Sequence, residues 1–298
     1  MEKVCVLMST YNGEKFLKEQ LDSLVAQEGV DISILVRDDG SKDGTKEILD
    51  DWQEKGLLTW YTGENLKSAR SFMHMVSVAP DADYYAFCDQ DDVWETNKIV
   101  SAISLMKEKE CDLYYSSYTT VDSELNVLSK DVQKPIMNTL GTAFVYASVT
   151  GCTMVFSHNL LVKAKKYEPH HLMMHDSWLY KIALATGGRV VYDSHSHILY
   201  RQHENNVIGD HHSKLILWKN RLGRIIHGDR KRYGEVKDLY DGYKDIMGEK
   251  ELNTILPLIG YYDKSLFKRI SIAFSSKYKT GVLSKDILFK IAVIFKLF

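Results

Sequence analysis

Residues 84–92 read YYAFCDQDD, an apolar run that ends in three carboxylates. The apolar run at residues 32–36 precedes Asp38 and Asp39 in the same way. Because the carboxyl ends of parallel strands line the ligand crevice of an open sheet, both acidic groups are expected at one site. Oxygen ligands of this kind suit magnesium or manganese, which bind through one or two carboxylates and substrate phosphates. The two stretches therefore predict a parallel sheet with a metal-dependent site for a nucleotide diphosphate at its edge.

The pattern around these stretches indicates an α/β protein. Short apolar runs alternate with helical periodicity, which is typical of a Rossmann-like, mostly parallel sheet flanked by helices. The expected strands are residues 4–8, 32–36, 57–62, 84–88, 113–118, 150–156, 189–192 and 197–203. The expected helices are residues 16–25, 45–55, 70–78, 97–109 and 178–185, followed by long basic amphipathic helices after residue 203.

Charge divides the chain into two parts. Residues 204–298 contain 18 Lys+Arg and 11 Asp+Glu, whereas residues 1–203 contain 20 and 29. The simplest partition is a catalytic domain over residues 1–210 and a basic amphipathic helical extension over residues 211–298. Such an extension can meet an anionic surface or can be a solvated helical face, and the sequence leaves both interpretations open.

Four cysteines, Cys5, Cys88, Cys111 and Cys152, are widely spaced and form no CxxC pair. They are expected as buried thiols in a reducing compartment. The charged start of the chain does not have the pattern of a signal peptide. We therefore expect a cytoplasmic protein.

The last stretch, residues 287–298, is apolar apart from Lys290 and Lys296. It is too short to span a bilayer, which needs about 20 residues. Together with Lys285 it has the composition of a helix that lies in the membrane interface, peripheral on the inner face of the cell membrane. A helix that packs on the protein's own core is the other interpretation, and a homo-oligomer through the C-terminal helices is a further one.

Three pieces of the chain carry a family resemblance. They are VLMSTYNGEKFLKEQLDSLVAQ at residues 6–27, VRDDGSKDGT at 36–45 and FCDQDDVW at 87–94. In this order they resemble the nucleotide-binding half of the inverting glycosyltransferases of family 2, which have the GT-A fold, and the resemblance covers residues 3–203. MHDSW at 174–178 and YRQHENNVIG at 200–209 look like the bacterial rhamnosyltransferase-like subgroup.

The resemblance implies a nucleotide-sugar half at about 1–118 and an acceptor half at about 119–210. It implies transfer of a hexosyl group, with L-rhamnose from dTDP-L-rhamnose as the best expectation. The acceptor would be a hydroxyl of a cell-surface polysaccharide or a lipid-linked glycan, and no nucleic acid partner is expected. The metal would be Mg²⁺ or Mn²⁺.

The nucleotide site is expected at two strand ends. In the resembling family the turn of Thr10, Tyr11 and Asn12 grips the nucleoside, although small polar residues also cap helices well. An aspartate at Asp38 or Asp39 selects the base in that family. The other interpretation of this pair is turn formation, since Asp-Asp-Gly-Ser is a good turn sequence.

The metal site is expected at the DQDD motif of residues 89–92. Two side chains that are two positions apart on an extended segment point the same way, so Asp89 and Asp91 can address one metal–diphosphate unit. The resemblance makes Asp91 the metal ligand and places Asp89 at the ribose or sugar. It implies that His203 completes the metal sphere and that the diphosphate or sugar contacts come from Asp92, Trp94, Arg201 and Asn206.

For Asp92 and Trp94, an acid at a helix N-terminus and a packing tryptophan are equally good accounts.

Asp176 matches the catalytic carboxylate of the resembling family, which would act as the general base on the acceptor hydroxyl. The common family pattern has Glu-Asp where this chain has His175-Asp176. His175 and Trp178 are expected at the substrate. A helix N-cap is the alternative role for Asp176, and the two roles are compatible.

Other classes of protein fit the sequence less well. The first strand is not followed by GxGxxG, and no GxxxxGK[ST] is present, which argues against dehydrogenases and P-loop enzymes. A sugar nucleotidyltransferase and a non-catalytic sugar-nucleotide-binding subunit are the remaining alternatives. His170, His171 and His175 lack the cysteine partners and spacing of zinc sites.

Overall fold

The structure is a computed structural model that describes residues 1–203 and 231–298. The strands of the described parts are β1 Lys3–Thr10, β2 Asp31–Asp38, β3 Thr59–Thr62, β4 Tyr84–Cys88, β5 Val93–Trp94, β6 Leu113–Val121, β7 Val127–Ser129, β8 Val155–Ser157 and β9 Val190–Arg201. The helices before residue 204 are α1 Leu17–Val25, α2 Thr45–Glu54, α3 Lys67–Val78, α4 Lys98–Lys109, α5 Leu140–Val145, the 3₁₀ turn η1 Gly151–Thr153, α6 His158–Ala164 and α7 His175–Ala185. The α-helices after residue 230 are α9 Lys231–Tyr243, α10 Glu249–Ile255, α11 Leu266–Ala273 and α12 Leu283–Ile294.

The strands form one mixed sheet in the order β3-β2-β1-β4-β8-β6-β9-β5, with β7 beside β6. The first four strands of this order are parallel, β8 is antiparallel to both β4 and β6, and β9 is parallel to β6. Thr10 of β1 pairs with Asp38 of β2, and Met8 pairs with Cys88 of β4. The two acidic stretches therefore leave the sheet at the same edge, as expected.

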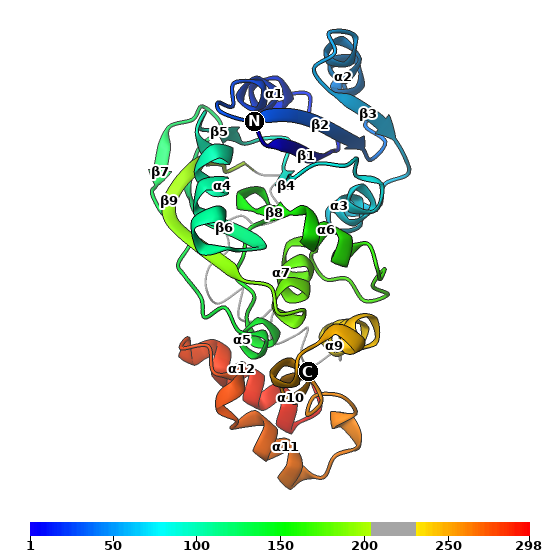
Figure 1. Cartoon of the computed structure of the whole chain (residues 1–298), viewed down its shortest axis with the longest axis vertical. Helices are drawn as coiled ribbons and strands as arrows, with labels where there is room; N and C mark the ends of the chain where they lie inside the picture. Colours follow the sequence, from blue (N-terminus) through cyan, green and yellow to red (C-terminus); the bar gives the residue numbers. More distant parts are fainter. Residues whose placement is uncertain (204–230) are drawn as a thin grey trace.

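Side-chain alternation along β1 assigns its residues to two separate cores. Val4, Val6 and Met8 belong to a core that is formed with α1, α2 and α4. Cys5 and Leu7 belong to a second core, which includes residues of α3, α5, α6, α7 and the C-terminal helices. The sheet is thus covered by helices on both faces, which leaves its polar strand ends as the place for a ligand (Figure 1).

Two predicted strand assignments were wrong. Residues 150–156 were predicted as one strand, but they form η1 followed by the short strand β8. Glycine at 151 permits the close approach of η1 to α7, because a Cβ there would lie 2.6 Å from Nε2 of His175. Residues 189–192 and 197–203 were predicted as two strands, but they form the single strand β9. The polar stretch Asp193–His197 looks like a loop, yet it stays in the ladder through irregular pairing with β6.

The C-terminal helices that the structure describes share a core with the rest of the protein. Val236, Phe289 and Phe298 belong to the same core as Trp178 of α7. Packing of the last stretch on the protein's own core is therefore confirmed for one side of α12. None of the helices in residues 1–203 and 231–298 combines the length and the apolar character needed to cross a membrane.

Helix α9 is held to α7 and to the segment before it by buried charges. Lys181 forms a buried ion pair with Glu235, and Asp238 accepts a hydrogen bond of 2.6 Å from the backbone N–H of His171. A Cβ at Gly234 would lie 2.3 Å from the His171 ring, so glycine permits this close approach. These contacts connect α9 to the residues that lead into His175.

Replacing Lys181 alone is expected to destabilise the protein strongly, because Glu235 would remain buried without its partner. Lys181→Met should lower the free energy of unfolding by about 3–5 kcal/mol, whereas the matched pair Lys181→Met with Glu235→Leu should recover most of that loss. Urea denaturation of the two variants and the wild type measures both values. A single variant that unfolds within about 1 kcal/mol of the wild type would contradict the expected cost of an unpaired buried charge.

Candidate active site

A cleft of about 450 Å³ lies at the carboxyl edge of the sheet. It is formed by the ends of β1 and β4, by the turn into α3, by η1 and by the start of α7. Four of the described carboxylates line it, namely Asp39, Asp89, Asp91 and Asp176, and Thr10 lies beside them. The cleft therefore unites the RDDGS turn, the DQDD motif and the HDSW motif, although these lie far apart along the chain.

The adjacent aspartates of the RDDGS turn have different positions. Asp38 is buried outside the cleft, where its carboxylate accepts hydrogen bonds from the N–H groups of Gly40 at 3.1 Å and Ser41 at 2.9 Å. Its position fits the turn interpretation rather than base selection. Asp39 lines the cleft, pairs with Arg37 and accepts a 3.1 Å hydrogen bond from the N–H of Leu66. Of the two, Asp39 is therefore the candidate for contact with a nucleoside.

The turn after β1 is divided in the same way. Thr10 and Tyr11 line the cleft, whereas Asn12 adopts a φ of 50° outside it and its Oδ1 accepts a 2.9 Å hydrogen bond from the N–H of Lys42. Gln90, which the sequence did not single out, holds Tyr11 in place. Its Oε1 accepts from the Tyr11 N–H at 2.9 Å and its Nε2 donates to the Tyr11 carbonyl at 3.2 Å.

Arg201 does not have the position expected for a diphosphate ligand. Its side chain is buried outside the cleft, where Nε donates to the carbonyl oxygen of Asp91 at 2.8 Å and a second nitrogen pairs with Glu19. The Arg201 backbone N–H donates to the carboxylate of Asp92 at 3.1 Å. Arg201 therefore holds the DQDD turn in place through its contacts with Asp91 and Asp92. The local sequence did not indicate that this side chain would be buried.

Asp92 and Trp94 also lie outside the cleft. Asp92 is fully buried, and Trp94 is covered by the Lys98 amine, which lies 3.2 Å from the centre of the indole ring. Burial lowers the pKa of Lys98 to about 8, while the nearby Cys88, Cys152 and Asp92 act in the opposite direction. The packing interpretation of Trp94 is thus the one that fits, and Lys98 is a buried cation near the acids that sequence reasoning missed.

Carboxylates are crowded around the DQDD turn. Burial raises the pKa of Asp89 to about 7, and the neighbouring charges of Asp91 and Asp176 act in the same direction. Asp91 lies 2.7 Å from Nε2 of His203, which follows the end of β9. Carboxylate oxygen and imidazole nitrogen are suitable donors for a divalent cation, whose charge would relieve this crowding. The residues present therefore fit the metal site expected at Asp91 and His203.

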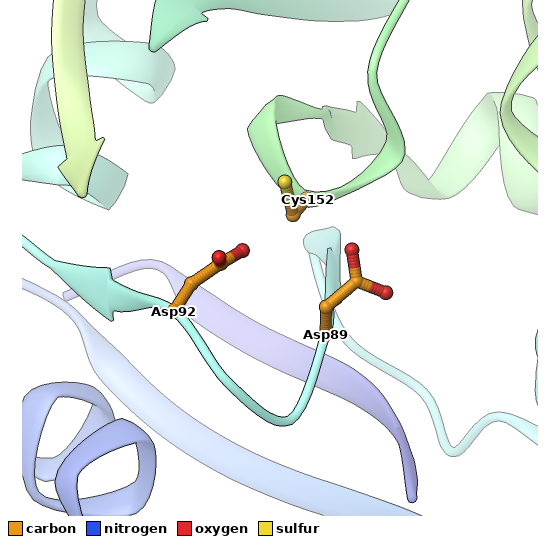
Figure 2. Close-up of side chains that lie close together, drawn as sticks. All are labelled: Asp89, Asp92 and Cys152. Carbon is orange, nitrogen blue, oxygen red and sulfur yellow. The ribbon is translucent and has the colours of Figure 1, made fainter. Parts of the chain in front are cut away.

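A second group of potential ligands lies beside this pair. Asp89 and Asp92, at the two ends of the turn, both point toward Cys152 of η1 (Figure 2), and ligand atoms of the three residues lie within 4.8 Å of one another. Burial raises the pKa of the Cys152 thiol well above its usual value, with Asp92 and Asp89 adding to the effect. The protonated thiol is a weak donor to the carboxylates and a poor ligand for a hard cation. Asp91 and His203 are therefore the better metal candidates.

Asp176 lies in the first turn of α7 and lines the cleft near the DQDD motif. Met174 occupies the N-cap position, so the N-cap interpretation of Asp176 was wrong. The Asp176 carboxylate accepts hydrogen bonds from the N–H of Ser177 and, at 3.2 Å, from the N–H of Gly151. Burial nevertheless raises its pKa to about 6. Asp176 is thus an oriented carboxylate that can accept a proton near neutral pH.

His175 and Trp178, both expected at the substrate, have different positions. His175 lines the cleft, and its ring stacks on Phe72 at 4.0 Å between centroids. Burial lowers the pKa of His175 to about 3, so the ring is neutral at physiological pH. Trp178 is fully buried in the core and does not reach the cleft. Asn206 lies outside the described residues.

Comparison with known proteins gives a consistent picture. Residues 5–181 match the model of the family described as glycosyl transferase family 2. The chain is 31% identical over 232 residues to the dTDP-rhamnosyl transferase RfbG of Shigella flexneri, a match that covers 73% of this chain and 78% of RfbG. It is 23% identical over 225 residues to WfaP of Escherichia coli, a UDP-Glc:alpha-D-GlcNAc-diphosphoundecaprenol beta-1,3-glucosyltransferase, with 76% of this chain and 87% of WfaP covered.

Solved structures share the fold. TarS 1-349 of S. aureus in complex with UDP-GlcNAc aligns with a TM-score of 0.57 at 18% identity, covering 99% of this chain and 91% of that chain. The mannosyltransferase PcManGT of Pyrobaculum calidifontis in complex with GDP-Man and Mn²⁺ aligns with a TM-score of 0.55 at 16% identity, covering 99% and 87%. The fold is therefore GT-A, as the sequence predicted.

Proposed function

The chain belongs to glycosyl transferase family 2 and is a glycosyltransferase, and we propose that it moves L-rhamnose from dTDP-L-rhamnose to a glycan hydroxyl with inversion at the anomeric carbon. The observation that carries the proposal is that Asp39, Asp91 and Asp176 line one cleft. This cleft can hold a nucleotide at one end and place a base near the sugar at the other. The rhamnosyl donor is supported by the similarity to RfbG, whose name states that donor class.

On the donor side, the proposed contacts come from β1, β2 and β4. Asp39 accepts from the N3–H of the pyrimidine ring, and Thr10 and Tyr11 lie along the nucleoside. Thymine and uracil present the same hydrogen-bonding edge, so these contacts select a pyrimidine rather than one of the two bases. Asp91 and His203 would hold a divalent cation, which when bound supplies a Lewis acid to neutralise the charge of the departing diphosphate.

On the acceptor side, Asp176 is the proposed general base. An alcohol has a very high pKa, so its proton must be removed as the hydroxyl attacks the anomeric carbon. The hydrogen bonds from Gly151 and Ser177 fix the orientation of the Asp176 carboxylate, and its raised pKa makes it a better proton acceptor than an exposed aspartate. Attack from the side opposite the leaving diphosphate inverts the anomeric centre through an oxocarbenium-like transition state.

We further propose that the acceptor is a lipid-linked glycan of cell-surface polysaccharide synthesis. The name of WfaP, which specifies a diphosphoundecaprenol-linked acceptor, supports this class. Four free cysteines, three of them buried, suit a protein that works on the cytoplasmic side of the membrane.

A thermal-shift screen of nucleotide sugars, with and without manganese, tests the donor. A cognate donor binds the folded state only, so dTDP-L-rhamnose should raise the melting temperature more than UDP-glucose or GDP-mannose at equal concentration. Release of the nucleoside diphosphate from the preferred nucleotide sugar, measured with a glycan acceptor present, then gives the turnover. A larger shift with UDP-glucose would overturn the rhamnosyl donor but leave the glycosyltransferase assignment intact.

A further inference from the structure

Helices α11 and α12 expose a set of large apolar side chains at the end of the molecule opposite α2 (Figure 1). Phe267 is 85% exposed, Leu283 73% and Phe295 66%. No described segment of the chain covers these side chains. We call the α11–α12 face the surface formed by six of them, Phe267, Phe274, Leu283, Ile287, Ile291 and Phe295.

The apolar side chains of α12 exceed what its core packing uses. Leu283, Ile287 and Ile291 recur at every fourth residue, and this row is continued by Phe295, so they follow one side of the helix. The opposite side carries Phe289, which is buried in the core. A helix that only packs on its own protein usually has polar residues on the outer side. Helix α12 instead has apolar residues on both sides.

Helix α11 extends the same surface. Its Ile272 is buried, whereas Phe267 and Phe274 are exposed. The two helices pack against each other, because Arg269 donates a hydrogen bond to the carbonyl of Ile294 and the Lys290 amine lies 4.6 Å from the centre of the Phe274 ring. These contacts hold the two helices side by side, so the exposed apolar residues of both lie at the same end of the protein.

The segment that carries this surface is basic. Residues 264–298 contain eight Lys+Arg and a single acidic residue, Asp286. Asp286 is buried and accepts hydrogen bonds from Thr280, so it does not offset the charge of the surface. Lysines next to exposed aromatic rings, such as Lys290 beside Phe274, keep their amines at the edge of an apolar patch. An apolar centre with a basic edge matches the surface of an anionic bilayer.

We infer that the α11–α12 face binds the surface of an anionic lipid bilayer, with its aromatic and aliphatic side chains in the interface and its lysines at the headgroups. A second copy of the chain fits less well, because a symmetric contact would bring the basic edges of two protomers together. The inference goes beyond the proposed function and is independent of the donor, the metal and the base.

Flotation of the full-length protein with lipid vesicles tests the inference. Vesicles that contain phosphatidylglycerol should carry the wild type to the top of the gradient, and vesicles of phosphatidylcholine alone should carry much less. The variant Phe267→Ser, Leu283→Ser and Phe295→Ser should reduce the bound fraction about tenfold or more, because it removes the insertion of three large side chains. Lys268→Gln with Lys296→Gln should weaken binding to the anionic vesicles only.

The matched control is Val127→Ser with Leu128→Ser, which removes two exposed apolar residues of β7 at a distant site. This control should float like the wild type, and all variants should keep the wild-type melting temperature and dTDP release. Failure of the wild type to float, equal flotation of the triple variant, or a wild-type dimer that the triple variant converts to a monomer would each overturn the inference. A wild type that floats with the vesicles but releases no dTDP would instead count against the proposed function alone.

Discussion

Asp176→Asn is expected to reduce glycosyl transfer about 10²–10⁴-fold while donor affinity stays close to that of the wild type. Asparagine keeps the size of the side chain and can still accept a hydrogen bond from the N–H of Gly151, but it cannot take a proton from the acceptor hydroxyl. Turnover with an acceptor measures the loss, and the thermal shift with dTDP-L-rhamnose measures donor binding. Asp112→Asn removes a carboxylate outside the cleft and should leave turnover unchanged.

The pH dependence of the wild type gives a second measurement on the same residue. Burial raises the pKa of Asp176 to about 6, so the carboxylate becomes protonated as the pH falls through that value. The kcat/KM of the wild type should therefore be constant at neutral pH and fall tenfold per pH unit below about pH 6. Asp176→Asn should remove this acid limb. Substantial transfer by Asp176→Asn, with an unchanged acid limb, would assign the base to another residue.

Asp91→Ala is expected to have the other large effect, a loss of about 10³-fold in turnover together with weaker donor binding. The reason is that the variant removes one of the two side chains proposed to hold the cation, while the backbone carbonyl of Asp91 can still accept from Arg201. Turnover, the donor thermal shift and manganese binding by paramagnetic resonance measure three separate consequences. All three should fall together.

Two further variants separate the carboxylate from the shape of the turn. Gln90→Ala removes the contacts to Tyr11 but leaves every carboxylate in place, so it should retain manganese binding. His203→Ala removes the second proposed ligand and should weaken manganese binding. If Asp91→Ala binds manganese as well as the wild type does, Asp91 is not a ligand. Asp89, Asp92 and Cys152 would then be the better candidates for the metal site.

The sequence predicted the sheet well where apolar runs end in polar turns. The strand at residues 84–88 agrees with β4, because five apolar residues are followed by acids that cannot continue a buried strand. The prediction failed for β9, since its polar stretch Asp193–His197 resembles a loop. There the pairing with β6, a contact distant in sequence, keeps the segment extended. Local strand propensity cannot predict a contact between residues that are distant in sequence.

The site was predicted to the level of the motif but not of each residue. Asp38 and Asp39 look equivalent in the sequence, yet successive side chains of an extended segment point in opposite directions. Asp39 therefore enters the cleft while Asp38 closes the turn, and Asp91 and Asp92 are divided in the same way. Arg201 is buried against its partner Glu19, which is far away in the chain, so the motif alone did not predict that its side chain lies outside the cleft.

The ion pair between Lys181 and Glu235 bears on how related chains should be compared. The family match ends at Lys181, but the carboxylate that neutralises this buried ammonium group comes from the tail. A chain shortened just before α9 would thus leave an unpaired internal charge in α7, five residues after Asp176. We expect homologues whose tails have diverged to keep an acid at the matching place or to lack the lysine. Joint variation of these two positions across species would therefore trace how far the tail and the catalytic residues have evolved as one unit.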